Sequence, residues 1–223
     1  AFTYGQYAIV ADNKFIGIAG STDPVSTSID SGALEARTRY YIFERNWFTN
    51  MVGASAALGL NSDFSTIRNN IIDMSARSAP FGGICISVSS GDTHTPTNNW
   101  VYNNTCYANQ GGANQMRGVR VSSGSINTTL KNNLLYAPTA TIATTIDNFL
   151  GVGPVGFSGT DGNTSDVNAK ISPNFVSATP SLPPDFKITA GHAFGTGSTV
   201  QSVPTDFFGV TNSAPWDAGA VRH

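Results

Sequence analysis

One asparagine set between apolar positions recurs five times along the chain. In each copy, an apolar residue stands three positions before the Asn, a variable residue stands two before it, and a second apolar residue stands two after it. Polar and apolar residues alternate on both sides, and the apolar set is rich in β-branched and aromatic types. Each copy is therefore predicted to form a strand, a corner and a second strand. The five residues are Asn13, Asn46, Asn70, Asn104 and Asn133, at spacings of 24 to 34 residues.

A fixed corner residue at this spacing is typical of a solenoid, in which equivalent residues of successive repeats lie above one another. Asn tolerates the left-handed backbone conformation and bonds nearby backbone, so it is expected to turn the corner itself. Stacked strands lie about 4.7–4.9 Å apart, which lets the Asn side chains of neighbouring repeats hydrogen-bond in a ladder. The apolar residues on either side then form two continuous columns.

A second set of short alternating segments lies between these repeats, with Gly or other small residues near their starts. If these segments are strands, Leu58 and Val119 point inward, whereas Cys85 and Arg120 point outward. Loops of unequal length between the strands explain the variable repeat length, because insertions in repeat proteins map to loops. The predicted strands of this set are residues 32–38, 55–61, 82–88 and 117–123.

The pattern divides the chain into predicted coils over residues 1–150 and a tail over residues 151–223. Gly, Pro, Ser and Thr dominate from 151 to 184, where the Asn repeat does not recur cleanly. The tail is therefore expected to be irregular and packed along the coils. At the other end, the first coil presents an open sheet edge, which natural proteins cover. We expect N-terminal coils that are missing here or supplied by another chain stacking on this one.

Composition narrows the classes of function. Charged residues make up only 12% of the chain, about half the usual share, and the net charge is −2 with a pI near 5.8. Nucleic-acid binders carry a basic stripe, so the charge argues against that partner, and no apolar run approaches the ~20 residues that span a bilayer.

Two Cys and three His offer no zinc spacing. Cys106 falls in an apolar column as a buried filler. Free thiols are favoured for both cysteines, although a disulfide between them suits a secreted protein.

Three stretches of the chain resemble the right-handed parallel β-helix proteins of the pectate lyase-like superfamily, in particular the bacterial secreted type. They are residues 34–50 and 63–75, which contain the strand–Asn–strand repeat, and the closing residues 185–223. The closing segment departs from the family pattern, because His192 stands where Ser is usual and Ala218 replaces Ile. The resemblance implies an all-β fold: a single-stranded right-handed parallel β-helix (solenoid) of about five to six coils with an irregular C-terminal tail. It also implies a secreted or cell-surface location.

Enzymes of this superfamily act mostly on acidic polysaccharides, and the lyases among them remove the proton α to a uronate carboxylate. That step needs a base, Lys or Arg with a lowered pKa, and a cation, usually Ca²⁺ bound by oxygen ligands. Glu35 and Arg37 lie two apart on one predicted strand and share a face, and Arg120 is expected on the same sheet. The resemblance assigns Glu35 as Ca²⁺ ligand and Arg37 and Arg120 as catalytic base or carboxylate clamp. Alternatively, Glu35 and Arg37 form an exposed ion pair of little energetic value.

Substrate contacts are predicted from aromatic and polar residues near the corners and in one loop. Trp47 and Tyr102 flank corner asparagines, and rings that face solvent there would stack on sugars along successive coils. Lys131 occupies the same variable, solvent-facing position as Tyr102. Asp92 and His94 lie in one polar loop and are candidates for a groove rim. The alternatives are that the rings cover the core beneath loops and that the polar loop is merely solvated.

Two functions follow from these residues and this resemblance. The first is a polysaccharide lyase that cleaves a uronate-containing polysaccharide by β-elimination, with Ca²⁺ as the one expected cofactor. The second is a non-catalytic structural or adhesive solenoid, such as a surface, tailspike-like or filament component, that binds glycans or stacks on other chains through its open first coil. A glycoside hydrolase is less well supported, because it needs paired carboxylates and the acidic residues form no local cluster.

Overall fold

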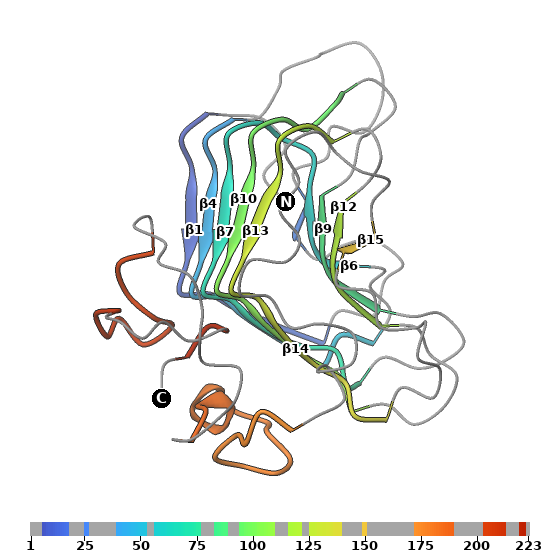
Figure 1. Cartoon of the computed structure of the whole chain (residues 1–223), viewed down its shortest axis with the longest axis vertical. Coiled ribbons are helices and arrows are strands. Elements are labelled where there is room, and N and C mark those ends of the chain that lie inside the picture. Colours follow the sequence, from blue (N-terminus) through green and yellow to red (C-terminus); the bar gives the residue numbers. More distant parts are fainter. Residues whose placement is uncertain are drawn as a thin grey trace.

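The computed structural model is an all-β structure in which every strand-to-strand pairing is parallel (Figure 1). Within the residues that it describes, the one helix is the short 3-10 helix η3 (Pro183–Phe186), and none has the length and apolar character needed to cross a membrane. The described residues are 6–17, 25–26, 39–52, 56–76, 83–88, 94–109, 116–121, 125–139, 149–150, 172–189, 203–212 and 219–221.

Three five-stranded sheets each take one strand from every repeat, so each strand pairs with the strand three elements away. This arrangement is consistent with a β-solenoid, as the repeat predicted. We call three consecutive strands a rung and number the rungs 1 to 5, from β1–β3 to β13–β15. Sheet 1 contains β1 (Ile9–Ala11), β4 (Ile42–Glu44), β7 (Thr66–Arg68), β10 (Trp100–Tyr102) and β13 (Thr129–Lys131). Sheet 2 contains β2 (Lys14–Ile16), β5 (Trp47–Thr49), β8 (Ile71–Asp73), β11 (Thr105–Tyr107) and β14 (Leu134–Tyr136). Sheet 3 contains β3 (Val25–Ser26), β6 (Ala56–Leu60), β9 (Gly83–Val88), β12 (Met116–Val121) and β15 (Phe149–Leu150).

Two apolar columns line the interior, as the sequence predicted. Their members are in parallel register from rung to rung and belong to one core cluster, apart from the partly buried Phe15, which packs against it. Burying a side chain of this size contributes about 1.5–3 kcal/mol, so the two columns are a main source of stability. The sheet 1 column is Val10, Phe43, Ile67, Val101 and Leu130, and the sheet 2 column is Phe15, Phe48, Ile72, Cys106 and Leu135.

The predicted Asn ladder is present, but the Asn is not the residue that turns the corner. Asn46 donates from Nδ2 to Asn70 Oδ1 (3.0 Å), and Asn70 donates from Nδ2 to Asn104 Oδ1 (2.9 Å). The backbone N–H of each Asn donates to the same oxygen, so the side chain is directed along the stack and the turn falls on the residue before it. The residues with positive φ at this corner are Asp12, Arg45, Asn69, Asn103 and Asn132.

Three of the four predicted segments of the second set are strands, namely β6, β9 and β12 in sheet 3. Leu58 and Val119 are buried as expected, and both align with Ile86. The fourth predicted segment, residues 32–38, lies outside the described residues. The strand paired with β6 on that side is β3 instead.

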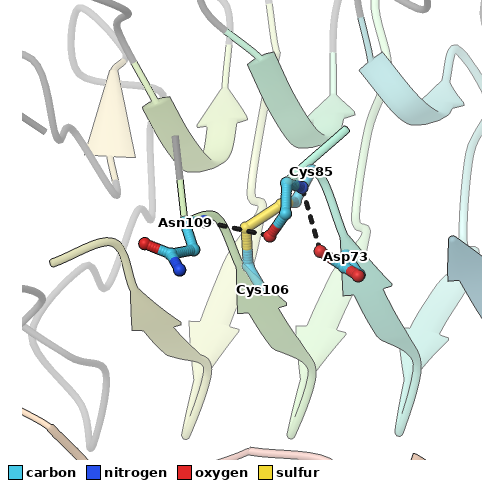
Figure 2. The surroundings of a disulfide bond; sticks show 5 residues. Asp73, Cys85, Cys106 and Asn109 are labelled. Carbon is cyan, nitrogen blue, oxygen red and sulfur yellow. Dashed lines mark hydrogen bonds between the residues drawn. A yellow bond between two sulfur atoms is a disulfide. The ribbon is translucent and has the colours of Figure 1, made fainter. Parts of the chain in front are cut away.

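The two cysteines form a disulfide, which corrects two expectations: free thiols and an outward-facing Cys85 (Figure 2). Strict alternation fails in β9, because Cys85, Ile86 and Val88 all belong to the core cluster. Cys85 is fully buried, and its Cα lies 6.0 Å from that of Cys106 in sheet 2. The bond therefore joins β9 of rung 3 to β11 of rung 4.

Described C-terminal segments pack against residues of sheets 1 and 2. Phe175 and Phe186, next to and within η3 (orange in Figure 1), make edge contacts with Tyr107 of β11 at 6.4 Å and 5.6 Å between ring centroids. Val203 packs against Tyr102 of β10. Parts of both sheets are thereby withdrawn from solvent.

Candidate functional site

Each rung turns a second time where the chain passes from sheet 3 to sheet 1, and we call this turn the second corner. Its turning residues have positive φ, and their backbone N–H groups donate to a carbonyl of the next rung, from Tyr40 to Asp63 (3.0 Å) and from Phe64 to Thr97 (3.0 Å). Each stands six positions before a ladder Asn, so the two corners repeat in step. The turning residues of the second corner are Tyr7, Tyr40, Phe64, Asn98 and Asn127.

Three aromatic rings stack at the second corner of rungs 1 to 3. The ring centroids of Tyr7 and Tyr40 are 4.7 Å apart, and those of Tyr40 and Phe64 are 5.4 Å apart, with nearly parallel planes. The parallel register causes this stacking, because it holds equivalent side chains about one strand spacing apart. Tyr7 is 73% exposed and Tyr40 is 37% exposed. This aromatic strip of Tyr7, Tyr40 and Phe64 therefore reaches the surface.

A buried carboxylate lies directly beside the aromatic strip. Asp63 Oδ1 accepts hydrogen bonds from the backbone N–H (3.0 Å) and the hydroxyl (2.8 Å) of Thr97. His94 Nε2 lies 3.2 Å from the same oxygen, and Arg39 Nε lies 3.6 Å from Asp63 Oδ2. We call Arg39, Asp63 and His94 the Asp63 cluster.

Two nitrogens of the Asp63 cluster have unused hydrogen-bonding capacity. Arg39 Nε and His94 Nε2 are buried and make no hydrogen bond within the described structure, although each lies close to the carboxylate. A buried donor without a partner costs about 1–3 kcal/mol, and the nearest acceptor for both nitrogens is the Asp63 carboxylate, 3.2 Å from His94 Nε2 and 3.6 Å from Arg39 Nε. The side chain of Arg39 is 35% exposed and that of His94 is 9% exposed. Arg39 is thus the solvent-facing member of the cluster.

Sequence reasoning singled out His94 but missed Arg39 and Asp63. The signal that finds them is position, because Arg39, Asp63 and Thr97 each stand seven residues before a ladder Asn. Arg39 and Asp63 form a parallel bridge between neighbouring rungs. A fixed offset from the Asn repeat therefore predicts that these residues are stacked, even though their chemistry varies.

Charged residues at the first corner neutralise one another instead. Arg45 donates to both carboxylate oxygens of Asp12 (2.8 and 2.9 Å) and to Glu44 (2.7 Å), and Arg68 donates to the other oxygen of Glu44 (2.7 Å). The hydrogen bonds from Arg45 hold the pKa of Asp12 below its ordinary value. These four side chains satisfy each other, so we interpret the network as structural.

The catalytic and metal-binding residues predicted from the sequence are not assembled in the described part of the chain. Arg120 is half-buried on β12, in register with Ser87 of β9 and Leu150 of β15. Among the described residues, no group of three His, Cys, Asp or Glu is placed to hold a metal ion. Glu35, Arg37 and Asp92 lie outside the described residues, so the Ca²⁺ site and the Arg37–Arg120 pair stay predictions.

The aromatic residues predicted to bind sugar are covered or engaged. Tyr102 is 6% exposed beneath Val203, and burial raises its pKa to about 12. Lys131 lies beside Tyr102 in register on β13. The ammonium of Lys14 lies 4.0 Å from the centroid of the Trp47 ring, in a cation–π contact. The structure thus brings Tyr102 and Lys131 side by side, whereas His94 belongs to the Asp63 cluster.

In the described part of the chain, the Asp63 cluster and the aromatic strip bring together a partly exposed Arg39 side chain, the exposed rings of Tyr7 and Tyr40, and two buried nitrogens without a hydrogen bond. No protein-family model, no curated protein and no solved structure matches the chain.

Proposed function

We propose that this chain is a single-stranded right-handed parallel β-helix of about five to six coils, of the pectate lyase-like type, and that it is a lyase of uronate-containing polysaccharide. Three parallel sheets that share one strand per rung, and the Asn ladder, support this architecture. A fold does not determine a reaction, so the proposed activity depends on the Asp63 cluster.

We place the protein outside the cytosol, as a secreted or cell-surface protein. The disulfide between Cys85 and Cys106 supports this location. Disulfides persist in oxidising compartments and are rare in the cytosol. An acidic polysaccharide is the partner that we expect there.

The observation that carries the proposal is the position of Arg39, which directly precedes the exposed Tyr40 in the chain and lies 3.6 Å from Asp63 of a buried His–carboxylate pair. A guanidinium binds a carboxylate through two parallel hydrogen bonds. The apolar face of a sugar packs against an aromatic ring. Arg39 would therefore neutralise the uronate carboxylate while Tyr40 contacts a sugar ring of the same polymer.

His94 is the proposed base. Asp63 lies against Nε2, which favours the proton on that nitrogen and leaves the lone pair on Nδ1. Nδ1 takes the proton from the carbon α to the carboxylate, and the released electron pair forms a carbon–carbon double bond. The bond from the β carbon to the glycosidic oxygen breaks, and water protonates that oxygen. Arg39 stabilises the negative charge that develops on the carboxylate in the transition state.

A β-elimination assay tests the proposal. Pectate, alginate and a glycosaminoglycan are each incubated with the protein, with Ca²⁺ or with a chelator, and the ultraviolet absorbance of the unsaturated product is followed. We expect product from one polymer and a loss of about 100-fold or more in His94→Gln. Arg39→Gln should lose activity and also bind the polymer more weakly. Arg45→Gln is the matched control, because its guanidinium is engaged at the first corner and its loss should leave activity unchanged.

Two further outcomes separate this site from the alternatives. Activity that is lost in Arg120→Ala but kept in His94→Gln would move the reaction to sheet 3, where the sequence predicted it. Product that disappears with chelator would support the Ca²⁺ predicted at Glu35. Unsaturated product from none of the polymers would end the lyase proposal, and retained polymer binding would then support an adhesive solenoid.

A structural or adhesive solenoid is the second candidate function. The observation that favours it is the aromatic strip, in which the exposed ring of Tyr40 stacks on Phe64 and can contact a glycan without any catalytic group.

A further inference from the structure

At rungs 4 and 5, the turning residue of the second corner is an asparagine instead of an aromatic residue. Asn98 and Asn127 continue the column of Tyr40 and Phe64 and have positive φ like them. Asn127 is exposed and Asn98 is partly exposed, and Asn127 Nδ2 donates to Asn98 Oδ1 (3.0 Å). The backbone N–H of Asn98 also donates to the carbonyl of Ile126 (2.9 Å), which joins the two rungs. We call Asn98 and Asn127 the amide pair.

The hydrogen bond within the amide pair leaves one donor group and one acceptor group. A carboxamide has two N–H donors and an oxygen with two lone pairs. Within the described structure, Asn98 Nδ2 donates to no other group and Asn127 Oδ1 accepts from none. A ligand that binds both side chains must therefore supply an acceptor for Asn98 and a donor for Asn127.

A secondary amide supplies both groups. Its carbonyl oxygen accepts a hydrogen bond from Asn98 Nδ2, while its N–H donates to Asn127 Oδ1. A carboxylate has acceptors only, so it would face Asn127 Oδ1 with another oxygen. A hydroxyl has both functions on one oxygen, so a further contact is needed to distinguish a hydroxyl from an amide.

An exposed apolar side chain provides that contact. Ile126 directly precedes Asn127 in the chain, is 41% exposed and forms a parallel bridge with Thr97 of rung 4. The acetamido group of an N-acetylhexosamine ends in a methyl group, and contact between a methyl group and an apolar side chain is favourable in water. A hydroxyl offers no such contact. Donor, acceptor and apolar side chain together favour an acetamido group.

The amide pair lies on the same corner as the Asp63 cluster. Arg39 and Ile126 each stand seven residues before a ladder Asn, in rungs 2 and 5. Because rungs lie about 4.7–4.9 Å apart, the column from Tyr40 to Asn127 extends over about 14 Å. This length accommodates a short oligosaccharide that follows the corner. A bound polymer would then reach a guanidinium at one end and the amide pair at the other.

We propose that the amide pair binds the acetamido group of an N-acetylhexosamine, and that the polymer at the second corner contains both uronate and N-acetylhexosamine units. Asn98 Nδ2 donates to the acetyl carbonyl, Asn127 Oδ1 accepts the amide N–H, and Ile126 contacts the methyl group. The uronate part of this assignment rests on the proposed function. The acetamido site rests on the amide pair and Ile126.

Two neutral tetrasaccharides test the acetamido site. Chitotetraose and cellotetraose have the same linkage and the same sugar ring, but chitotetraose has an acetamido group where cellotetraose has a hydroxyl. Isothermal titration calorimetry measures the binding of each to the full chain. We expect chitotetraose to bind at least about tenfold more tightly, because of the added hydrogen bond and methyl contact.

Substitutions in the protein locate the binding surface. Asn98→Asp retains an acceptor for Asn127 Nδ2 but removes the donor to the acetyl carbonyl, so the preference for chitotetraose should disappear. Ile126→Ser should reduce that preference about fourfold. Asn174→Asp is the matched control, because Asn174 is also exposed with positive φ, and it should bind as the wild type does. Circular dichroism and urea unfolding verify that the variants are folded.

Equal binding of the two tetrasaccharides, or no binding of either, would overturn the acetamido site. A preference that survives Asn98→Asp would also overturn it. Neither tetrasaccharide contains uronate, so these outcomes are independent of the lyase proposal. The polymer is tested with His94→Gln, which should bind hyaluronan, a polymer of glucuronate and N-acetylglucosamine, more tightly than pectate. Tighter binding of pectate would overturn the assignment of the polymer.

Discussion

The two corners of each rung share a backbone geometry but differ in side-chain chemistry. At both, a residue with positive φ turns the chain and donates its N–H to the next rung, from Asp12 to Glu44 (3.2 Å) and from Tyr7 to Arg39 (3.1 Å). After the turn, the first corner repeats Asn five times. The second corner has Ala8, Tyr41, Ser65, Asn99 and Thr128 at the same place. The backbone therefore turns without a fixed side chain, and the ladder contributes stability more than shape.

The second corner shows how different side chains perform one task. Asn99 Oδ1 accepts the backbone N–H of Ser65 (2.9 Å), and Ser65 Oγ accepts the backbone N–H of Tyr41 (3.1 Å). An amide and a hydroxyl thus satisfy equivalent donors in neighbouring rungs. Because this corner does not require one residue type, its outer positions are free to carry the Asp63 cluster and the aromatic strip.

Replacement of Asn by Ser at each of the two corners should give the largest difference in stability between them. Asn70→Ser leaves the backbone N–H and Nδ2 of Asn46 without their buried acceptor, at about 1–3 kcal/mol for each group. We therefore expect the free energy of unfolding to fall by about 3 kcal/mol or more. Asn99→Ser should cost only about 1 kcal/mol, because Ser already serves at this place in rung 3. Urea unfolding measures both values, and equal losses would contradict a special role for the ladder.

Removal of the disulfide should have the next largest effect. The bond closes a separation of 21 residues, and its loss should lower the free energy of unfolding by about 3 kcal/mol in the chain-entropy model. Urea unfolding compares the oxidised wild type with the double variant Cys85→Ala/Cys106→Ala and with the reduced wild type. Because β9 leads towards the second corner, amide hydrogen exchange should increase there more than at the Asn ladder. Faster exchange at the ladder alone would contradict this view.

The smallest effect concerns Tyr102, on the covered face between the two corners. Its pKa is raised to about 12 by burial, so the folded state keeps a proton that the unfolded state loses near its ordinary value of 10. The stability from the neutral, buried phenol is thus present below pH 10 and is lost as pH rises towards 12, by about 1 kcal/mol near pH 11. Tyr102→Phe should show a shallower alkaline loss, measured by denaturant unfolding across that range. An identical pH dependence in both proteins would show that Tyr102 is not covered.

The repeat was sufficient to predict the features that depend on the register between rungs. Val10, Phe43 and Ile67 could be assigned to one column because apolar residues recur at one offset from the Asn, and the parallel sheets and the ladder followed from that. The turning residue was assigned one position too late, because Asn suits a left-handed turn wherever it stands. The sequence does not reveal that the backbone N–H and Nδ2 of Asn46 both donate to Asn70 Oδ1, which directs the Asn46 side chain along the stack.

What the sequence could not predict depends on contacts between unrelated positions. The disulfide was not predicted because strict alternation of inward and outward residues directs Cys85 outward. In β9 this alternation breaks, and Cys85 lies in the core. The burial of Tyr102 needed Val203, a residue far along the chain. In the Asp63 cluster, His94 was predicted as a rim residue, but its partner Asp63 lies on the preceding rung and is recognised only when the rungs are stacked.

The short sequence distance between paired rungs has a consequence for biosynthesis. Successive ladder asparagines are 33, 24, 34 and 29 residues apart, so every rung pairs with one made shortly before it. At about 5–20 residues per second, a rung follows its template by a few seconds, and a chain that emerges from its N-terminus can add rungs in order of appearance. The cysteines of rungs 3 and 4 can then meet before rung 5 has left the ribosome. Assembly of the stack would therefore be coupled to its synthesis.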